Sequence, residues 1–363
     1  VLRACELLRS FRSDGELLRL RDMVERTGLP KSTTHRLLRT LQKGGMIEEA
    51  AHDQYRCLIR AAERQRRLRV GFGAQTTSTT FSQAVTDSVR KAASDNNVDL
   101  VEVNNRYSSK TALRNADLLV RERVDVAIEF QTYENVAPVI AARFLSAGIP
   151  VIAVEIPHPG AVYFGANNYE AGIIGGRALG RWAKDNWTGV VDEVILLEER
   201  IAGPLPQARL TGAITGIREV LPEMTRANVI TFDGKGAYGP SFDLVRKHLR
   251  KQTRKRTLIA AINDPSALGA LRAFEECGYN SYCAVMGQNA IAEAREEIRK
   301  PGSRLIGSVA YFPERYGQEL IPLAIAMAAG KQAPPAVFTK HKLVTSKNID
   351  EVYPREKAAA AVG

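Results

Sequence analysis

TGLPKSTTHRLLRTLQKGG, residues 27–45, is the stretch that decides how the first part of this chain folds. Gly28 suits the left-handed backbone of a tight turn, and Pro30 suits the first position of a helix. The glycine pair at the end of the stretch favours termination of that helix. We therefore expect a helix that begins at Pro30 and ends at about Lys43.

This predicted helix has two chemically different faces. At about 100° per residue, one face gathers Thr34, Leu37, Leu38 and Leu41, which we expect to be buried. The first turn and the opposite face carry no acid and consist of Lys31, Ser32, Thr33, His35, Arg36, Arg39 and Lys43. A solvated helix more often mixes both signs of charge. Arg, Ser and Thr side chains bond to DNA bases and phosphates, and a helix N-terminus attracts phosphate. We predict these seven residues as DNA contacts; the alternative is a packing module of three helices.

The flanking residues predict two more helices and a β-hairpin. An apolar stripe at helical spacing runs from Leu2 to Phe11, and a second short helix fits residues 20–26. After the glycine pair, Met46–Glu49 and Gln54–Cys57 are short extended pieces around a polar turn. Three helices followed by such a wing form a winged helix-turn-helix, which places one helix in the DNA major groove.

Residues 2–60 resemble the N-terminal DNA-binding domain of IclR-type regulators. The shared pattern is TGLPKST-x-HRLL-x-TL, followed by a glycine turn and a wing that ends in Tyr55-Arg56. The resemblance implies DNA contacts by Lys31, Ser32, Thr33, His35 and Arg36. Thr34 departs from the family, which usually has an apolar residue there, so we expect slightly weaker core packing at that position.

The composition is that of a soluble globular protein. With 363 residues, 45% hydrophobic and 25% charged, the chain is long enough for two or three packed units. No run approaches the roughly 18 apolar residues of a membrane span, and the N-terminus lacks the pattern of a signal peptide. We therefore expect a cytoplasmic protein without a membrane partner.

Charge and cysteine content narrow the possible partners. Residues 1–69 hold 16 of the 51 Lys and Arg residues but only 9 of the 40 Asp and Glu residues, which favours a polyanionic partner. The four cysteines form no CxxC motif and have no His cluster beside them: Cys5, Cys57, Cys277 and Cys283. We expect reduced thiols rather than a disulfide scaffold or a zinc site.

The remaining three hundred residues alternate short β-rich runs with helical stretches. The predicted strands are Val70–Gly73, Leu100–Val103, Val124–Phe130, Val151–Val154, Glu193–Leu197, Val229–Phe232, Leu258–Ala261 and Ala284–Gly287. Repeated strand–helix units predict parallel sheets with helices on both faces, and this much chain predicts two such sheets. A dinucleotide-binding fold is disfavoured because GAQTTSTTF, not GxGxxG, follows the first strand.

Polar and aromatic residues stand at the ends of several predicted strands and the starts of helices, which is where ligands bind in such folds. The candidates for ligand binding are Thr79, Phe81, Glu155, Arg209, Asn263, Asn289 and Tyr311. Aromatic rings stack on the CH faces of a sugar or polyol, and paired polar groups hold its hydroxyls. Each residue alone is more often a helix cap or a satisfied core group, so the hypothesis depends on the set.

Residues 69–353 resemble the type I periplasmic sugar-binding fold of ribose-binding proteins and LacI-type effector domains. INDPSALGALRAF, which begins at Ile262, is close to that family's strand-Asn-Asp-x-x-Ala-x-Gly-Ala signature, and Arg209–Gly212 carries its R-x-x-G step. The resemblance implies that Phe81 stacks on the ligand. It implies hydrogen bonds to the ligand from Glu155, Arg209, Asn263, Asn289 and Tyr311. The family commonly has Asp where this chain has Glu155 and Asn289, so a sugar-like polyol is expected but ribose is not.

Together the two resemblances predict a bacterial ligand-responsive transcription regulator, a repressor by family analogy. It would bind a double-stranded DNA operator as a homodimer and sense a sugar or polyol by hinge closure. The alternatives are a solute-binding protein of a sugar transport system and a sugar-modifying enzyme. We expect no catalytic residue, metal or cofactor because GxSxG, HExxH and P-loop motifs are lacking and the five His are scattered.

The expected domain organisation follows from these matches. A winged helix-turn-helix domain spans 1–60, a linker 61–68, a two-lobed domain 69–354 and a tail 355–363. Lobe 1 comprises about 69–168 and 312–341, and lobe 2 about 169–311 and 342–354.

Overall fold

The computed structural model describes residues 2–59, 67–226 and 228–355. The chain divides into two compact units. The first is Val1–Leu68 with Ile325–Gln332, and the second is Arg69–Ala324 with Ala333–Gly363. Most of the predicted linker and nearly all of the predicted tail lie outside the described residues.

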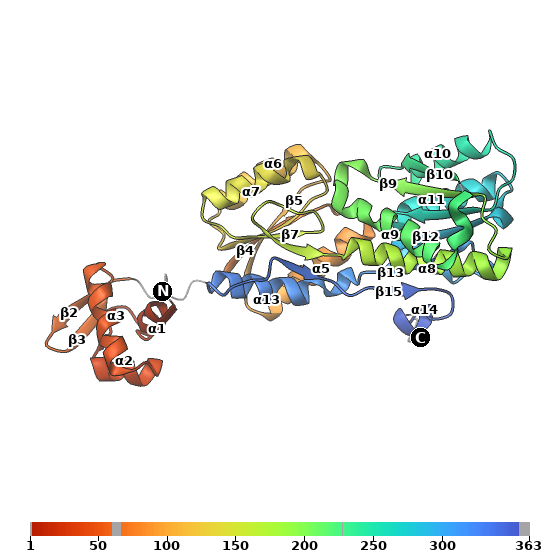
Figure 1. Ribbon diagram of the computed structural model, residues 1–363. Helices are drawn as coiled ribbons and strands as arrows, with labels where there is room; N and C mark the ends of the chain where they lie inside the picture. Colours follow the sequence, from red (N-terminus) through yellow and green to blue (C-terminus); the bar gives the residue numbers. More distant parts are fainter. Residues whose placement is uncertain (1, 60–66, 227, 356–363) are drawn as a thin grey trace, which may run out of the picture. The chain divides into compact units, whose positions relative to one another are not determined.

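The N-terminal segment of the first unit folds as a winged helix-turn-helix, as predicted (Figure 1). Its elements are α1 (Leu2–Arg9), β1 (Leu17–Leu18), α2 (Leu20–Thr27), α3 (Lys31–Lys43), β2 (Ile47–Ala51) and β3 (Gln54–Cys57). The wing strands β2 and β3 pair antiparallel, and β1, which the sequence did not predict, pairs with β3. Leu7, Met23 and Leu38 are fully buried where the three helices meet.

Local chemistry explains the start of α3. Gly28 has a φ of 66°, and its N–H donates to the main-chain oxygen of Val24, which closes α2 with a left-handed residue. Pro30 precedes the first helical residue and so becomes the N-cap. Thr34 is completely buried, and its hydroxyl donates to the main-chain oxygen of Pro30 at 3.2 Å. The core tolerates this polar residue because its hydroxyl returns a hydrogen bond to the backbone.

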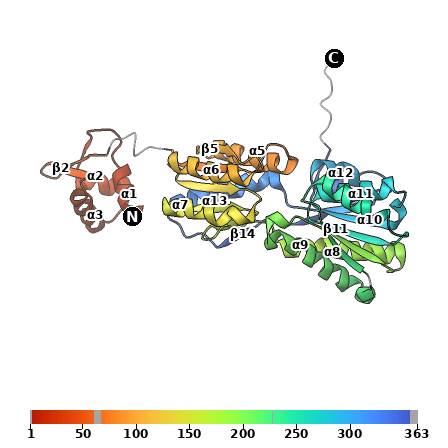
Figure 2. The ribbon, with the colours of Figure 1, turned by 90° about the horizontal axis from the view of Figure 1, so that it is seen from above.

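The second unit contains two six-stranded sheets, which define two lobes (Figures 1 and 2). The lobe 1 sheet has the order β14 (Ala336–Phe338), β8 (Val162–Gly165), β7 (Val151–Val154), β6 (Val126–Phe130), β4 (Arg69–Ala74), β5 (Asp99–Asn104). The lobe 2 sheet has the order β10 (Asn228–Asp233), β9 (Glu193–Glu198), β11 (Thr257–Ala261), β12 (Cys283–Asn289), β13 (Leu305–Ala310), β15 (Lys342–Val344). All pairings are parallel except that of β15 with β13.

Helices cover both faces of the lobe 2 sheet, because the apolar residues of β9 follow one another without interruption and point to both faces. Val194 and Leu196 pack on the side of α8 (Asn168–Trp187) and α9 (Pro204–Val220). Ile195 and Leu197 pack on the side of α10 (Tyr238–Leu249), α11 (Asp264–Glu276) and α12 (Ala292–Ile298). Figure 2 shows these two helix layers on opposite sides of the sheet. A parallel strand that is buried on both faces does not alternate apolar with polar residues, and this is why the middle of β9 is a continuous apolar run.

All eight predicted strands are present. Four strands of the second unit are absent from the sequence prediction, namely β8, β13, β14 and β15; β14 and β15 are edge strands, and β8 and β13 lie beside them. In the described chain, no helix combines the length and the apolar character needed to cross a membrane.

The chain passes between the two sheets at three places: between β8 and β9, between β13 and β14, and between β14 and β15. The first and third crossings are tied together, because the N–H of Asn167 donates to Nε2 of His341 at 3.0 Å. Burial lowers the pKa of His341 to about 4, so this imidazole is neutral and accepts the hydrogen bond. Crossing strands of this kind are the natural site of hinge motion between lobes.

Helices α8 and α9 pack backbone against backbone. A Cβ on Gly172 would lie 2.1 Å from the main-chain oxygen of Arg209, and one on Gly176 would lie 2.1 Å from that of Ala213. On the facing helix, a Cβ on Gly212 would lie 2.2 Å from the main-chain oxygen of Tyr169. Only glycine permits this approach, and it fixes the part of α9 (Pro204–Val220) where Arg209 stands.

Candidate DNA-binding helix and candidate ligand cavity

Helix α3 presents the predicted DNA-contacting residues at the surface. Lys31, Ser32, His35, Arg36, Arg39 and Lys43 are exposed and Thr33 is half-buried. The opposite face packs into the core through Thr34, Leu38 and Leu41. Pro30, the N-cap residue of α3, makes no side-chain hydrogen bond to the first turn. Backbone N–H groups at a helix N-terminus can bind a phosphate oxygen.

The wing brings acidic residues next to this helix, which the linear sequence did not reveal. Lys31, His35, Glu49 and Asp53 line one groove of about 510 Å³ between α2, α3 and the wing. The two acids also stabilise the wing turn, because the N–H of Asp53 donates to Oε1 of Glu49 at 3.1 Å. Arg21 lines the same groove, so the two acids face two cations, and the groove offers no net positive charge to a phosphate contact. Arg36, Arg39 and Lys43 do not line the groove and are better placed for one.

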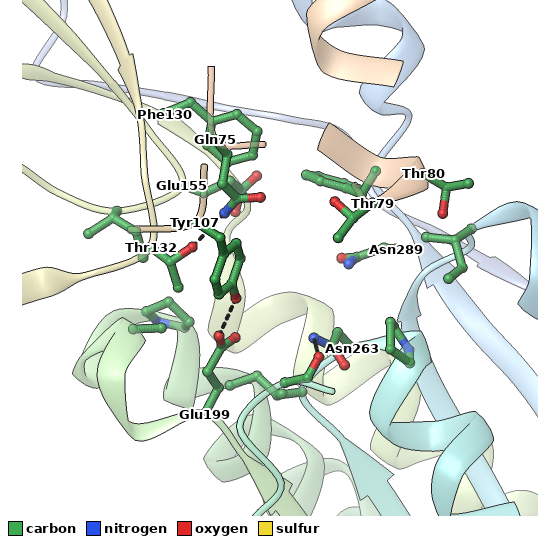
Figure 3. Close-up of a pocket in the computed structure, with 18 of the residues that line it drawn as sticks. Gln75, Thr79, Thr80, Tyr107, Phe130, Thr132, Glu155, Glu199, Asn263 and Asn289 are labelled. Carbon is green, nitrogen blue, oxygen red and sulfur yellow. Dashed lines mark hydrogen bonds between the residues drawn. The ribbon is translucent and has the colours of Figure 1, made fainter. Parts of the chain in front are cut away.

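The second unit has a cavity of about 130 Å³ at the carboxyl ends of strands from both lobes (Figure 3). Its lining is Gln75, Thr79, Thr80, Phe81, Tyr107, Phe130, Thr132, Glu155, Ile156, Glu199, Ala202, Pro206, Arg209, Gly236, Ile262, Asn263, Pro265, Asn289 and Ile291. Six of the seven predicted ligand-binding residues are among them. The volume is below the roughly 300–1,000 Å³ of pockets for drug-sized ligands, so the cavity suits a small molecule.

A buried ion pair joins the lobes at the base of the cavity. Nη2 of Arg209 donates to Oε2 of Glu155 at 3.2 Å. Nε of the same guanidinium donates to Oδ1 of Asn168 at 2.6 Å, and Nη1 donates to the main-chain oxygen of Ile262 at 3.0 Å. The other oxygen of Glu155 accepts the hydroxyl of Tyr316 at 2.6 Å. These bonds occupy three of the five N–H donors of Arg209.

Arg209 keeps its positive charge despite burial. Desolvation lowers its pKa, but the neighbouring Tyr311, Glu155 and Tyr163 outweigh that effect and hold the pKa above its usual value. Glu155 has a φ of 63°, a left-handed conformation that is uncommon for a residue with a long side chain. Such conformations persist where the surrounding structure over-determines them, often at binding sites.

Aromatic rings form the apolar part of the cavity wall in lobe 1. Phe81, in the first turn of α5 (Thr80–Asp95), meets Phe130 edge-on at 6.3 Å and Tyr316 edge-on at 6.0 Å between ring centroids. Thr79 is the N-cap of α5, and its hydroxyl oxygen accepts the N–H of Ser82 at 3.4 Å. Thr79 therefore has a structural role in addition to lining the cavity.

Two asparagines come from the lobe 2 side. Asn263 caps α11 by accepting the N–H of Ser266 at 3.0 Å, and its Nδ2 donates to the main-chain oxygen of Gly236 at 2.8 Å. Its amide retains one donor and one lone pair for a ligand. Asn289 has a φ of 99°, and its buried Oδ1 has no hydrogen-bond partner among the described residues. A buried acceptor without a partner is costly unless a ligand satisfies it.

Tyr311 does not line the cavity, although the sequence placed it with the ligand-binding residues. It is 1% exposed, and its hydroxyl donates to Oε1 of Gln288 at 2.8 Å. The guanidinium of Arg209 lies over its ring, 4.9 Å from the centroid. Its ring also packs against His341 at 4.9 Å. Tyr311 thus packs against the guanidinium of Arg209 without lining the cavity itself.

Sequence reasoning missed several cavity residues, chiefly Gln75, Tyr107, Thr132 and Glu199. Tyr107, from the loop after β5, donates its hydroxyl to Oε1 of Glu199, which follows β9, at 2.6 Å. Nε2 of Gln75 donates to the hydroxyl of Thr132 at 2.7 Å. All four follow the carboxyl ends of strands, so the rule that selected the other candidates also applies to them. In the chain as described, no cluster of three or more His, Cys, Asp and Glu residues could hold a metal ion.

This geometry defines a class: a winged helix-turn-helix joined to a two-lobed α/β domain with a small polar cavity between its lobes. Residues 70–332 match the family model of the periplasmic binding protein domain. Residues 1–51 match that of the IclR helix-turn-helix domain. The chain therefore belongs to the periplasmic binding protein domain family and begins with an IclR helix-turn-helix domain.

Solved structures share the fold of the two-lobed domain. An ABC transporter solute-binding protein from Mycobacterium smegmatis with bound glycerol is 20% identical, with a TM-score of 0.69 over 79% of this chain and 96% of that chain. One from Actinobacillus succinogenes 130z with bound D-allose is 16% identical, with a TM-score of 0.68 over 78% and 99%. One from Bacillus halodurans C-125 with bound myo-inositol is 18% identical, with a TM-score of 0.67 over 78% and 96%. Curated protein sequences contain no significant match to this chain.

Proposed function

We propose that this protein is a ligand-responsive transcription regulator that binds operator DNA through α3 and a sugar or polyol in the cavity between its lobes. The single observation that carries this proposal is the joining of an IclR helix-turn-helix domain to a periplasmic binding protein domain in one chain. A transport binding protein has no use for a DNA-binding domain. The domain matches include no catalytic domain, which disfavours a sugar-modifying enzyme.

The chemistry of the cavity supports a polyhydroxyl ligand. Two phenylalanine rings provide a stacking surface, and amide, carboxylate and guanidinium groups provide donors and acceptors for hydroxyls. Glycerol, D-allose and myo-inositol are bound by the structural relatives, and all three are neutral polyols or sugars. In this proposal Phe81 stacks on the ligand, and Glu155, Arg209, Asn263 and Asn289 hydrogen-bond it.

The mechanism we propose is hinge closure. Ligand binding favours the closed lobes, and the three crossings between the sheets transmit the change to the DNA-binding domains of a cytoplasmic homodimer. Two such domains recognise two half-sites related by two-fold symmetry. A ligand shifts DNA affinity only as far as its affinity differs between the two states, typically about 1–3 kcal/mol of coupling. Repression with release by ligand is the sign of regulation that we propose.

Two linked measurements test this function. In the first, thermal unfolding of the full chain is measured with glycerol, D-allose, myo-inositol and a wider sugar panel. A compound that raises the Tm is a ligand. Genomic fragments enriched on the immobilised protein then supply the DNA, and its affinity is measured with and without the ligand. We expect about 5–150-fold weaker binding with ligand. If a Ser32→Ala, Arg36→Ala double variant bound the fragments with unchanged affinity, α3 would not be the helix that reads the DNA. If the protein converted a bound sugar into a product, it would be an enzyme and not a regulator.

A further inference from the structure

A tyrosine and a glutamate meet across the cavity from opposite lobes. Tyr107 belongs to lobe 1 and Glu199 to lobe 2, and both line the cavity. The tyrosine hydroxyl donates to Oε1 of the glutamate at 2.6 Å. Figure 3 shows the ring directed toward the carboxylate, with the hydrogen bond between them. This bond links the lobes directly, so it forms only when they are closed.

Lobe 1 holds the tyrosine in a defined position. The hydroxyl of Tyr133 donates to the main-chain oxygen of Tyr107 at 2.9 Å, and the two rings meet edge-on at 6.1 Å. Tyr107 has a φ of 50°, which is a rare conformation for a bulky residue. A strained backbone that the surroundings hold in place is frequent where a side chain must be aimed at a ligand or a partner.

Lobe 2 holds the glutamate beside the ligand-facing amide. A Cβ on Gly236 would lie 2.5 Å from Oε2 of Glu199 and 3.0 Å from Nδ2 of Asn263. Glycine at this position therefore lets the carboxylate and the amide lie side by side at the cavity wall. Oε2 of Glu199 accepts no hydrogen bond from any residue that the structure describes, so it is a free acceptor.

The charges that line the cavity do not balance. Arg209 is the one cation of the lining, and Glu155 pairs with it at 3.2 Å. Glu199 has no ion pair within 4 Å in the described part of the chain. Desolvation raises the pKa of its carboxyl group, and the hydrogen bond from Tyr107 and the charge of Arg209 partly oppose that rise. The site thus holds two carboxylates and one guanidinium. A ligand that carried its own negative charge would meet two carboxylates that share the charge of one guanidinium, in a partly desolvated space where repulsion is strong.

We propose that Tyr107 and Glu199 form a clamp across the cleft that selects a neutral, hydroxyl-rich ligand and rejects sugar acids and sugar phosphates. Oε1 of Glu199 accepts the tyrosine hydroxyl, and Oε2 accepts a hydroxyl of the ligand. The same carboxylate therefore binds the ligand and holds the two lobes together. Part of this inference rests on the proposed function, because it takes the cavity to hold a sugar or polyol.

Matched neutral and anionic probes test the selectivity. The pairs are D-glucose with D-glucuronate, myo-inositol with myo-inositol 1-phosphate, and D-allose with D-allose 6-phosphate, each measured by thermal shift and calorimetric titration. The wild type is expected to bind the neutral member of a pair at least about tenfold more tightly. Glu199→Gln is expected to lower the ratio of the neutral to the anionic affinity several-fold. Tyr107→Phe is expected to weaken binding of the neutral member without strengthening binding of the anion.

Two control variants make the same chemical changes outside the cavity. Glu198→Gln alters a carboxylate that pairs with Arg200 and lines a different groove. Tyr169→Phe removes an exposed hydroxyl that donates to Thr215 at 3.2 Å. Both controls are expected to keep the wild-type ratio. The selectivity is refuted if an anion binds the wild type as tightly as its neutral partner does. It is also refuted if Glu198→Gln lowers the affinity ratio as much as Glu199→Gln does.

A measurement without ligand tests the clamp separately. Genetically encoded spin labels at exposed Leu118 in lobe 1 and exposed Tyr238 in lobe 2 report the distance between lobes. Tyr107→Phe and Glu199→Gln are expected to shift the distance distribution toward longer values than Tyr169→Phe. Unchanged distances refute the clamp even if the sugar assignment stands. If no neutral compound of the panel binds, both the proposed selection of neutral ligands and the assignment of a sugar ligand are refuted. The distances between the lobes still decide whether the clamp exists.

Discussion

Replacing Arg209 with methionine tests how far the cavity depends on one buried ion pair. The side chains of Arg209 and Glu155 are each 9% exposed. The substitution leaves the carboxylate with the hydroxyl of Tyr316 alone, and it leaves Oδ1 of Asn168 and the main-chain oxygen of Ile262 without their donors. Removing one partner of a buried pair costs roughly 3–5 kcal/mol. Water reaches the site through the adjoining cavity, so we expect about 3 kcal/mol.

The reciprocal change, Glu155→Gln, supplies the comparison. Glutamine keeps an oxygen for Tyr316, and Arg209 keeps its bonds to Asn168 and Ile262, so we expect a smaller loss of about 2 kcal/mol. In the double variant the unpaired charge that either single change creates is gone. The combined loss is therefore expected to fall short of the sum of the two single losses by at least about 1.5 kcal/mol.

Urea unfolding followed by tryptophan emission measures these losses in the relevant lobe. The chain has two tryptophans, Trp182 and Trp187, and both lie on α8, which packs against the helix that carries Arg209. The signal therefore reports lobe 2 and not the winged domain. Losses that add to within about 0.5 kcal/mol, or an Arg209→Met variant that loses under about 1 kcal/mol, would refute the view that the pair acts as a unit.

Three further predictions concern the helix contact, the DNA surface and pH. Gly176→Ala is expected to destabilise lobe 2 by about 2–3 kcal/mol in the same assay, because its Cβ would lie 2.1 Å from the oxygen of Ala213; an unchanged urea midpoint would contradict this. Ser32→Ala combined with Arg36→Ala is expected to weaken specific DNA binding at least about tenfold in fluorescence anisotropy without lowering the Tm, since both side chains are exposed. Burial raises the pKa of Glu129 to about 8, above its unfolded value, so the neutral form is favoured in the folded state and stability falls as pH rises from about 4 through 8. Glu129→Gln is expected to raise the free energy of unfolding by a few kcal/mol at pH 8 and to change it little at pH 4 in calorimetry, and equal effects at both pH values would refute the assignment.

The winged domain was predictable because its signals are local. Turn glycines, a helix-starting proline and the apolar stripe of α3 lie within a few residues of the elements that they define. The small antiparallel strand β1 was not predicted, because two residues carry no periodicity and only pairing with β3 makes them a strand. The acids of the wing, Glu49 and Asp53, lie far along the chain from Lys31, so their shared groove was invisible in sequence.

The candidate cavity was predictable in part. In parallel sheets the residues that follow the strands gather at one edge, and Phe81, Glu155, Asn263 and Asn289, which the strand-end rule selected, line the same cavity. The rule does not say which way a side chain points. Tyr311 follows β13, a strand that the sequence did not predict, and its ring packs against both the guanidinium of Arg209 and the ring of His341.

The sequence by itself determined the winged helix-turn-helix, the alternation of strands and helices in the two-lobed domain, the exposed cationic face of α3 and part of the set of polar groups from which a binding site is built. These properties follow from residue type and from spacing over one or two turns. Only the tertiary structure decided which groups meet: Arg209 with Glu155, and Tyr107 with Glu199, which lie 54 and 92 residues apart. Contacts at such separations depend on how three crossings position one sheet over the other, and no local pattern encodes that placement.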